Sequence, residues 1–192
     1  LWKLFQARWN LSGQPTRRPR ILFLADRNTL ADQAFNDFTG FAAFEDNALA
    51  RLEPADLRKK GRVPTNASVF ITIFQTFMSG PVVEGKPLPW FGQYPADFFD
   101  FIVIDECQNV AERARGAQKS QRARLAERLA TRSETLILLS ATPHDGKPES
   151  FASLMNMLDP TAIANPSAYT KDDIKDLYVR RFRKDVIADL RN

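Results

Sequence analysis

Four short apolar runs, rich in branched residues, are spaced along the chain. They are ILFLAD (21–26), VFITIF (69–74), FIVIDE (101–106) and TLILLSA (135–141). Runs of this length with little polar interruption are typical of strands in a parallel sheet whose two faces are both covered. Each run is therefore predicted to form a buried strand.

Helical patterns lie between these runs. Apolar residues recur at three- and four-residue steps over about 28–38, 116–131 and 148–158, and also over residues 1–10. Alternating strands and helices predict an α/β fold with a mostly parallel sheet, right-handed crossovers and helices on both faces.

The end of the chain differs from the rest by its charge. It carries YVRRFRKDV at 178–186, which predicts that residues 161–192 form a linker. A length of 192 residues fits one domain with a connecting segment, so residues 1–160 are predicted to form that domain. Because residues 1–10 have the pattern of the middle of a helix, we expect the domain to be truncated at its N-terminus.

Composition narrows the class of protein. With 44% hydrophobic and 26% charged residues, the chain lies in the ordinary globular range. No apolar run approaches the 18 or so residues that span a bilayer, so no membrane partner is expected. One cysteine and one histidine exclude a disulfide framework and a zinc site made only of those residue types. Sparing use of cysteine predicts a reducing compartment, the cytoplasm.

Positive charge is concentrated in one place. Residues 113–132 hold seven basic residues against the single acidic Glu127, within a chain whose net charge is +4. A local basic stretch of this kind suits a nucleic-acid backbone. The alternative is a solvated helix face, which the charge alone does not exclude.

The third apolar run ends in two adjacent carboxylates, Asp105 and Glu106. Ligands of open parallel sheets bind beyond the carboxyl ends of the strands. In phosphate-transfer sites one such carboxylate holds the shell of a nucleotide-bound magnesium ion, through water, and the next orients and deprotonates the attacking water. The alternative is that the chain turns outward and solvates both acids.

The fourth run ends in SATPHDG (140–146). Ser140 and Thr142 place two small hydroxyls at the strand tip, where they can hydrogen-bond a neighbouring carboxylate. The order of DECQ at 105–108 followed by this segment is more informative than either segment alone.

This ordered set resembles motifs II and III of the superfamily 2 helicases and translocases. LFLADRNTLADQ (22–33) resembles their motif Ia, and ITIFQTF (71–77) is similar to the strand that follows it. The first half looks most like the motor subunit of type I restriction enzymes, a ResIII-type helicase. The second half, from LILLSATPHDGKPE onward, is closer to chromatin-remodeller-like bacterial translocases.

The resemblance implies most of a first RecA-like P-loop NTPase domain, from a protein that couples hydrolysis of ATP with Mg²⁺ to movement on DNA in a restriction or defence system. It implies three sets of site residues. These are catalytic Asp105, Glu106 and Gln108, with Asp105 also holding the metal; coupling Ser140 and Thr142; and DNA-contacting Asp26, Arg27, Asn28, Gln33, Thr76, Arg122 and Arg124. The implied partners are DNA, a second RecA-like domain of the same chain and other subunits of a restriction or defence complex.

The chain departs from the family pattern at two points. Gln108 stands where the family commonly has histidine, and no G-x-x-x-x-G-K-[ST] phosphate loop is present. GPVVEGKP (80–87) matches the glycine and lysine spacing, but Pro87 supplies neither hydroxyl nor N–H. We therefore expect a RecA-like domain without its N-terminal phosphate-loop strand, and negligible ATP hydrolysis by these residues alone.

Two other functions fit parts of the sequence. One is a nucleic-acid-binding fragment that does not turn over ATP. The other is a small α/β phosphotransfer domain in which Asp105 acts alone, which leaves the segments at 22–33 and 140–146 unexplained.

Overall fold

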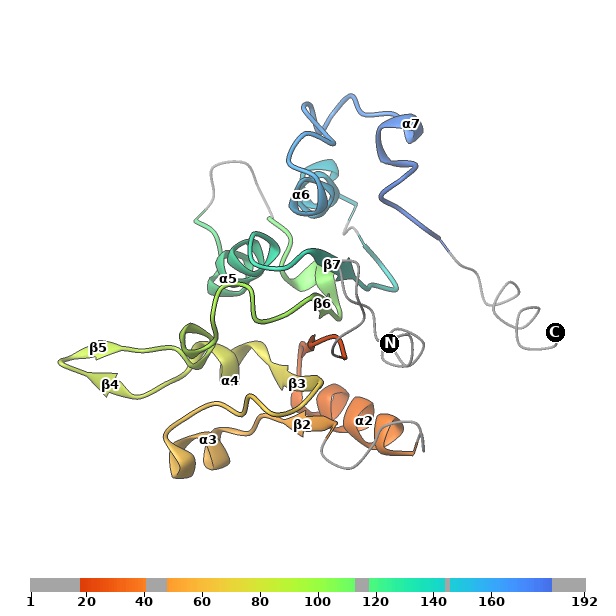
Figure 1. The fold of residues 1–192 in the computed structure, drawn as a ribbon. Coiled ribbons are helices and arrows are strands. Elements are labelled where there is room, and N and C mark those ends of the chain that lie inside the picture. Colours follow the sequence, from red (N-terminus) through yellow and green to blue (C-terminus); the bar gives the residue numbers. More distant parts are fainter. Residues whose placement is uncertain (1–17, 41–47, 113–117, 144–145, 181–192) are drawn as a thin grey trace.

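A five-stranded parallel sheet forms the centre of the computed structural model, which describes residues 18–40, 48–112, 118–143 and 146–180 (Figure 1). Its strand order is β2-β3-β1-β6-β7. The strands are β1 (Ile21–Ala25), β2 (Leu49–Arg51), β3 (Val69–Ile73), β6 (Phe101–Ile104) and β7 (Thr135–Leu138). All four pairings in this sheet are parallel, so the predicted α/β sheet is confirmed.

The predicted strands were one to three residues too long at their carboxyl ends, because Phe74 already begins a helix and Asp26, Asp105 and Ser140 lie in the segments that follow their strands. Strand β2 was not predicted. Its three residues are only half-buried, and Arg51 interrupts the apolar pattern.

Six helices, a hairpin and two short 3₁₀ turns complete the described part of the chain. The helices are α2 (Asn28–Thr39), α3 (Pro54–Lys60), α4 (Phe74–Met78), α5 (Gln121–Ala130), α6 (Pro148–Leu158) and α7 (Lys171–Ile174). The turns are η1 (Trp90–Gln93) and η2 (Cys107–Asn109). The hairpin joins β4 (Val82–Val83) to β5 (Lys86–Pro87). Helix α5 begins later than the predicted residue 116, because Ser120 caps it by accepting a hydrogen bond from the N–H of Ala123 at 3.1 Å. The helix predicted at 1–10 lies outside the described residues.

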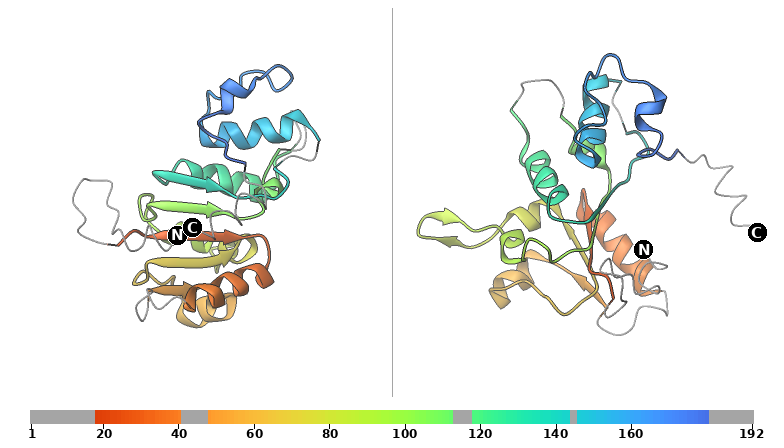
Figure 2. Two further views of the ribbon diagram at one scale, coloured as in Figure 1. Left: turned by 90° about the vertical axis from the view of Figure 1, so that its right-hand side faces the viewer. Right: turned by 45° about the horizontal axis from the view of Figure 1, so that its top comes forward.

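Alternating side chains of the strands enter two cores, one on each face of the sheet. Leu22 and Leu24 of β1 lie in the core covered by α3, α5 and α6, and Phe23 lies in the core covered by α2. The right-hand view of Figure 2 shows α2 on one side of the strands and α3 and α5 on the other. Helices therefore cover both faces, as predicted.

An aromatic cluster fills the larger core beside β3. Phe70 is fully buried, and its ring meets those of Tyr94, Phe98 and Phe99 at centroid distances of 5.9, 5.5 and 5.5 Å. Burial raises the pKa of the Tyr94 phenol, whose hydroxyl donates to the carbonyl of Pro64 at 2.9 Å. These contacts anchor the long connection between β3 and β6 on the sheet.

Strand β7 is an edge strand within the described part of the sheet. It pairs with β6 alone, and its four residues are half-buried, whereas every residue of β1, β3 and β6 is buried. Apolar side chains that remain half-buried at a sheet edge leave room for a further strand.

The near match to a phosphate loop at 80–87 forms an exposed hairpin that projects from the body of the domain (Figure 1). Glu84 and Gly85 both have positive φ, 51° and 75°, as a tight turn requires. Gly80 is required by a close approach, since a Cβ there would lie 1.7 Å from the carbonyl oxygen of Leu88. The hairpin is followed by the four-residue 3₁₀ turn Trp90–Gln93 and not by an α-helix, which supports rejecting it as a phosphate site.

The described residues after 160 pack back onto α6. Ile163 is 3% exposed, and its backbone N–H and carbonyl are both bonded to the Asn156 side chain. The rings of Tyr169 and Tyr178 lie 5.8 and 5.6 Å from that of Phe151. The predicted division between residues 160 and 161 stays a prediction, but the described part of this segment is attached to the domain and is not extended.

Candidate nucleotide and DNA site

The polar residues that follow β1, β6 and β7 meet at one edge of the sheet. The N–H of Asp105 donates to the carbonyl of Leu24 at 3.0 Å. The N–H of Leu139 donates to the carbonyl of Ile104, and its own carbonyl accepts from the N–H of Cys107, both at 2.9 Å. These backbone bonds continue the sheet beyond the strands and fix the two predicted motifs side by side.

Asp105 lies in a negative environment. Its pKa is raised, first by burial and further by the charges of Glu106 and Asp26, against a lowering hydrogen bond from the backbone of Glu106. A cation would relieve this repulsion, which fits a carboxylate that faces a metal ion. Among the described residues no group of three or more metal-ligating side chains is close enough to hold an ion, so a Mg²⁺ here would need phosphate or water oxygens as further ligands.

Glu106 has a left-handed backbone, with φ 52° and ψ 47°. This conformation costs a residue with a Cβ about 1–2 kcal/mol. Strain of this kind is found where the position of a side chain matters, and here it turns the chain sharply out of β6 into the turn at Cys107–Asn109.

A line of hydrogen bonds connects the two motifs. The amide of Gln108 donates through Nε2 to Oε2 of Glu106, and its Oε1 accepts from Oγ of Ser140 at 2.6 Å. Ser140 Oγ in turn accepts from the N–H of Thr142 at 3.0 Å. A glutamine amide offers both a donor and an acceptor, so Gln108 can bridge both neighbours at once.

Cys107 is not a nucleophile in this site. Its side chain is 3% exposed, and burial raises its pKa to about 12. The thiolate is therefore unpopulated near neutral pH, as expected for a small buried residue.

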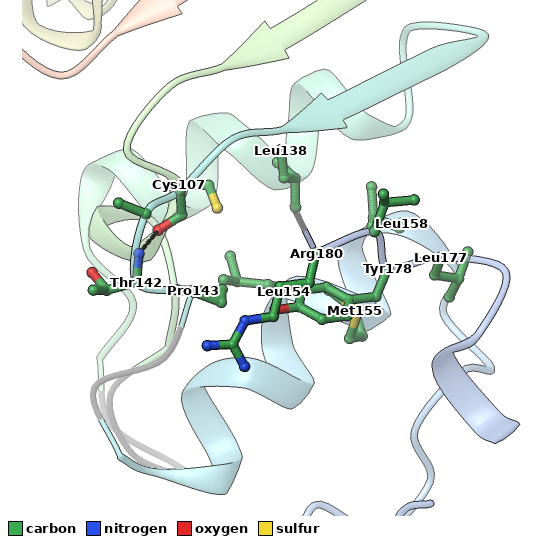
Figure 3. Close-up of a pocket in the computed structure, with 13 residues that line it drawn as sticks. Cys107, Leu138, Thr142, Pro143, Leu154, Met155, Leu158, Leu177, Tyr178 and Arg180 are labelled. Carbon is green, nitrogen blue, oxygen red and sulfur yellow. Dashed lines mark hydrogen bonds between the residues drawn. The ribbon is translucent and has the colours of Figure 1, made fainter. Parts of the chain in front are cut away.

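A cavity of about 530 Å³ opens beside the tip of β7 (Figure 3). Its walls include Thr142 and Pro143 from the tip, Leu154 of α6, and Tyr178 and Arg180 from the end of the described chain. Neither Asp105 nor Glu106 lines it, although Cys107 and Ser140, which lie beside them, do.

The stretch that resembles motif Ia begins with exposed polar groups. The side chain of Arg27 is 71% exposed, and Asn28 and Gln33 of α2 are also exposed. Arg51, which the sequence did not single out, holds the start of this helix by donating to Asn28 and Asp32, at 3.0 Å each. Nothing in the sequence around Arg51 signals that role, because its partners are about 20 residues away.

Three residues predicted to contact DNA are buried or half-buried in the structure. Asp26 is 7% exposed and forms an ion pair with Arg122, whose side chain is 29% exposed. Thr76 is 2% exposed. The DNA contacts of these three residues stay predictions; in this structure Asp26 and Arg122 bond to each other, and Thr76 is buried.

The basic helix α5 consequently has two different faces. Arg122 turns inward, whereas Arg124 and Arg128 are exposed. They line a shallow cavity of about 320 Å³ with apolar neighbours, and the guanidinium of Arg128 lies 5.8 Å from the ring centroid of Phe91. Neither arginine has a carboxylate partner among the described residues, so both remain available to an anion.

In the part of the chain that the structure describes, no helix has the length and apolar character needed to cross a membrane.

Comparison with known proteins agrees with this geometry. The sequence matches the family described as ResIII, the type III restriction enzyme res subunit, over residues 2–145. It is 37% identical over 105 residues to a type I restriction enzyme EcoAI endonuclease subunit from Escherichia coli, an alignment that covers 54% of this chain and 11% of that protein. The chain thus spans about a tenth of that relative's length. Because the family match covers most of the chain and the fold is a RecA-like α/β sheet, the chain belongs to the ResIII family and forms the first, helicase-type domain of a superfamily 2 protein.

Proposed function

We propose that the chain is part of an ATP-dependent motor that moves on DNA in a restriction or defence system. The observation that carries this proposal is the hydrogen-bonded line from Glu106 through Gln108 to Ser140. It joins a strained acidic strand end to the tip of the neighbouring strand. Structural acids that are merely solvated would need neither the strain nor the bridge.

In this proposal the two carboxylates have separate roles. Asp105 would hold a Mg²⁺ ion through water, and the ion would neutralise negative charge on the phosphates of ATP. Glu106 would orient the attacking water and take its proton. The hydrogen bond from Gln108 holds the Glu106 carboxylate in one orientation, which favours that role.

Gln108 and Ser140 would transmit a change at the phosphates to the tip of β7. A shift of Glu106 by a fraction of an ångström must stretch or move the amide of Gln108, because both of its ends are bonded. Ser140 and Thr142 would then move with it, since the Thr142 N–H is bonded to the Ser140 hydroxyl. This gives the proposed coupling residues a physical connection to the catalytic end.

DNA would lie across the exposed basic groups. Arg27, Asn28 and Gln33 are exposed at the start of α2, and Arg124 is exposed on α5. Arg51 bonds to the side-chain oxygen of Asn28, so the N–H groups of that amide can face a phosphate oxygen. These contacts carry no base information, so binding would be insensitive to sequence.

The phosphates of ATP need a loop that these 192 residues do not contain. We place its strand against the half-buried edge of β7, where a parallel neighbour would complete the burial of Leu136 and Leu138. A second RecA-like domain would close over the carboxyl ends of the strands and supply an arginine to the transition state. Other subunits of a restriction or defence complex are further proposed partners.

A triplex-displacement assay of the complete protein tests the proposal against the binding-only alternative. Displacement of a third strand with ATP and Mg²⁺, but not with a non-hydrolysable ATP analogue, is the expected result. DNA binding with neither displacement nor ATP turnover would favour the nucleic-acid-binding fragment instead.

A further inference from the structure

Arg122 and Asp26 join two elements that are 96 residues apart in the sequence. The guanidinium Nη1 of Arg122 donates to Oδ1 of Asp26, and the two side chains are 29% and 9% exposed. A carboxylate this far from solvent depends on its partner, because removing one member of a buried pair leaves an uncompensated charge. The contact therefore constrains both elements.

The helix itself does not favour this arrangement. Arg122 is the second residue of α5, so its charge lies at the positive end of the helix dipole. A cation there would ordinarily turn into solvent. Instead its guanidinium lies over the ring of Phe74, 5.8 Å from the centroid, and meets Asp26. Asp26 and Phe74, which follow two neighbouring strands, therefore determine where Arg122 lies.

Asp26 lies between the proposed DNA contact and the proposed ATP site. On one side it precedes Arg27 and Asn28, which begin the proposed DNA contact. On the other side it follows β1, where the carbonyl of Leu24 accepts the N–H of Asp105 at 3.0 Å. A displacement of Asp26 would therefore be transmitted to Asp105 through Leu24, which lies two residues before Asp26 and accepts the Asp105 N–H.

Arg27 supplies a way for DNA to act on this pair. Its Nε lies 3.5 Å from Oδ2 of Asp26, the oxygen that Arg122 does not hold. A DNA phosphate would compete with Asp26 for Arg27, because both are anions. When Arg27 binds the phosphate, Arg122 is the remaining ion-pair partner of Asp26, next to Asp105.

We infer that Arg122 and Asp26 form a positioning pair through which DNA bound at the start of α2 controls ATP turnover at Asp105 and Glu106. Arg122 touches neither DNA nor nucleotide in this role. The inference rests on the proposed function and adds a residue pair that regulates it.

The test compares DNA-stimulated with DNA-free ATP turnover in the complete protein. For Arg122→Gln the ratio of the two rates should fall by about 5-fold or more, the low end of typical coupling between sites. Arg122→Lys, which keeps the charge, should recover at least half of the reduction in that ratio. Arg58→Gln, an exposed arginine on α3, is the matched control and should leave the ratio unchanged.

A second comparison separates positioning from a merely structural role. Asp26→Asn should lower the ratio as Arg122→Gln does, and the double variant should be no worse than the more affected single variant, since both remove one interaction. Asp26→Asn, which keeps the shape of the side chain, also carries the test if Arg122→Gln does not fold.

The outcomes are distinguishable. If the wild type shows DNA-stimulated turnover and Arg122→Gln keeps the same ratio, the inference is overturned and the proposed function stands. Additive losses, or a loss of DNA-free turnover as large as that of stimulated turnover, would also overturn it. A wild-type protein that does not hydrolyse ATP on DNA would overturn the proposed function itself.

Discussion

The left-handed backbone at Glu106 makes a prediction about stability that is independent of catalysis. Replacing Glu106 with alanine or with glycine removes the same carboxylate and the same hydrogen bond from Gln108. The two variants then differ only in the backbone. At φ 52° alanine pays about 1–2 kcal/mol that glycine does not, while glycine loses about 0.4–1 kcal/mol through the greater freedom of its unfolded chain.

Glu106→Gly should therefore be more stable than Glu106→Ala, by up to about 1.6 kcal/mol. In a domain of this size each kcal/mol corresponds to about 2–4 °C in Tm. Thermal unfolding of the two variants, followed by circular dichroism, measures it. Both variants should be equally unable to hydrolyse ATP in the complete protein, because both lack the proposed base.

Lys175 provides the matched control. It is exposed and has an ordinary helical backbone, with φ −56° and ψ −36°. There the order should reverse, with Lys175→Gly less stable than Lys175→Ala by about 0.4–1 kcal/mol. If Glu106→Ala were as stable as Glu106→Gly or more stable, as expected for the same pair at Lys175, the backbone of Glu106 would not be strained.

Two further predictions concern charge. Burial raises the pKa of Asp105, so its ionised form destabilises the folded chain at neutral pH. Asp105→Asn should therefore raise Tm at pH 7. This gain should vanish as the pH falls below the ordinary pKa of 3.8, because Asp105 is then protonated in both the folded and the unfolded chain. A gain that grows toward acid pH would contradict the assignment. Replacing Arg124 and Arg128 with glutamine should flatten the salt dependence of DNA binding by about 0.9 for each phosphate that is no longer neutralised. Arg58→Gln with Lys59→Gln is the control, and equal slopes would remove α5 from the DNA surface.

Much of the fold could be predicted because its strands are buried on both faces. The runs at 21–26, 69–74 and 101–106 are nearly free of polar residues, and their strands occupy the centre of the sheet. Strand β2 has no such run because it lies at the edge and is half-buried. Helix α5 was predicted too long because charge and apolar spacing do not fix where a helix begins, whereas the cap at Ser120 does.

The candidate site could be predicted in outline but not in its contacts. The order of DECQ and SAT placed Asp105 and Ser140 at neighbouring strand ends, and the structure joins these two ends through Gln108. The pairing of Arg122 with Asp26 could not be predicted, because a basic helix gives no sign of which arginine turns inward. That contact depends on the packing of α5 over Phe74, a property of the folded chain alone.

In the proposed site Glu106 is the base that takes the proton of the attacking water. Single-turnover hydrolysis of ATP by the complete protein on DNA, comparing the wild type with Glu106→Gln, tests this role. The amide keeps the shape of the side chain but cannot take a proton, so nucleotide binding should remain while hydrolysis falls by about 10²-fold or more. Hydrolysis by Glu106→Gln at the wild-type rate would show that Glu106 is not the base.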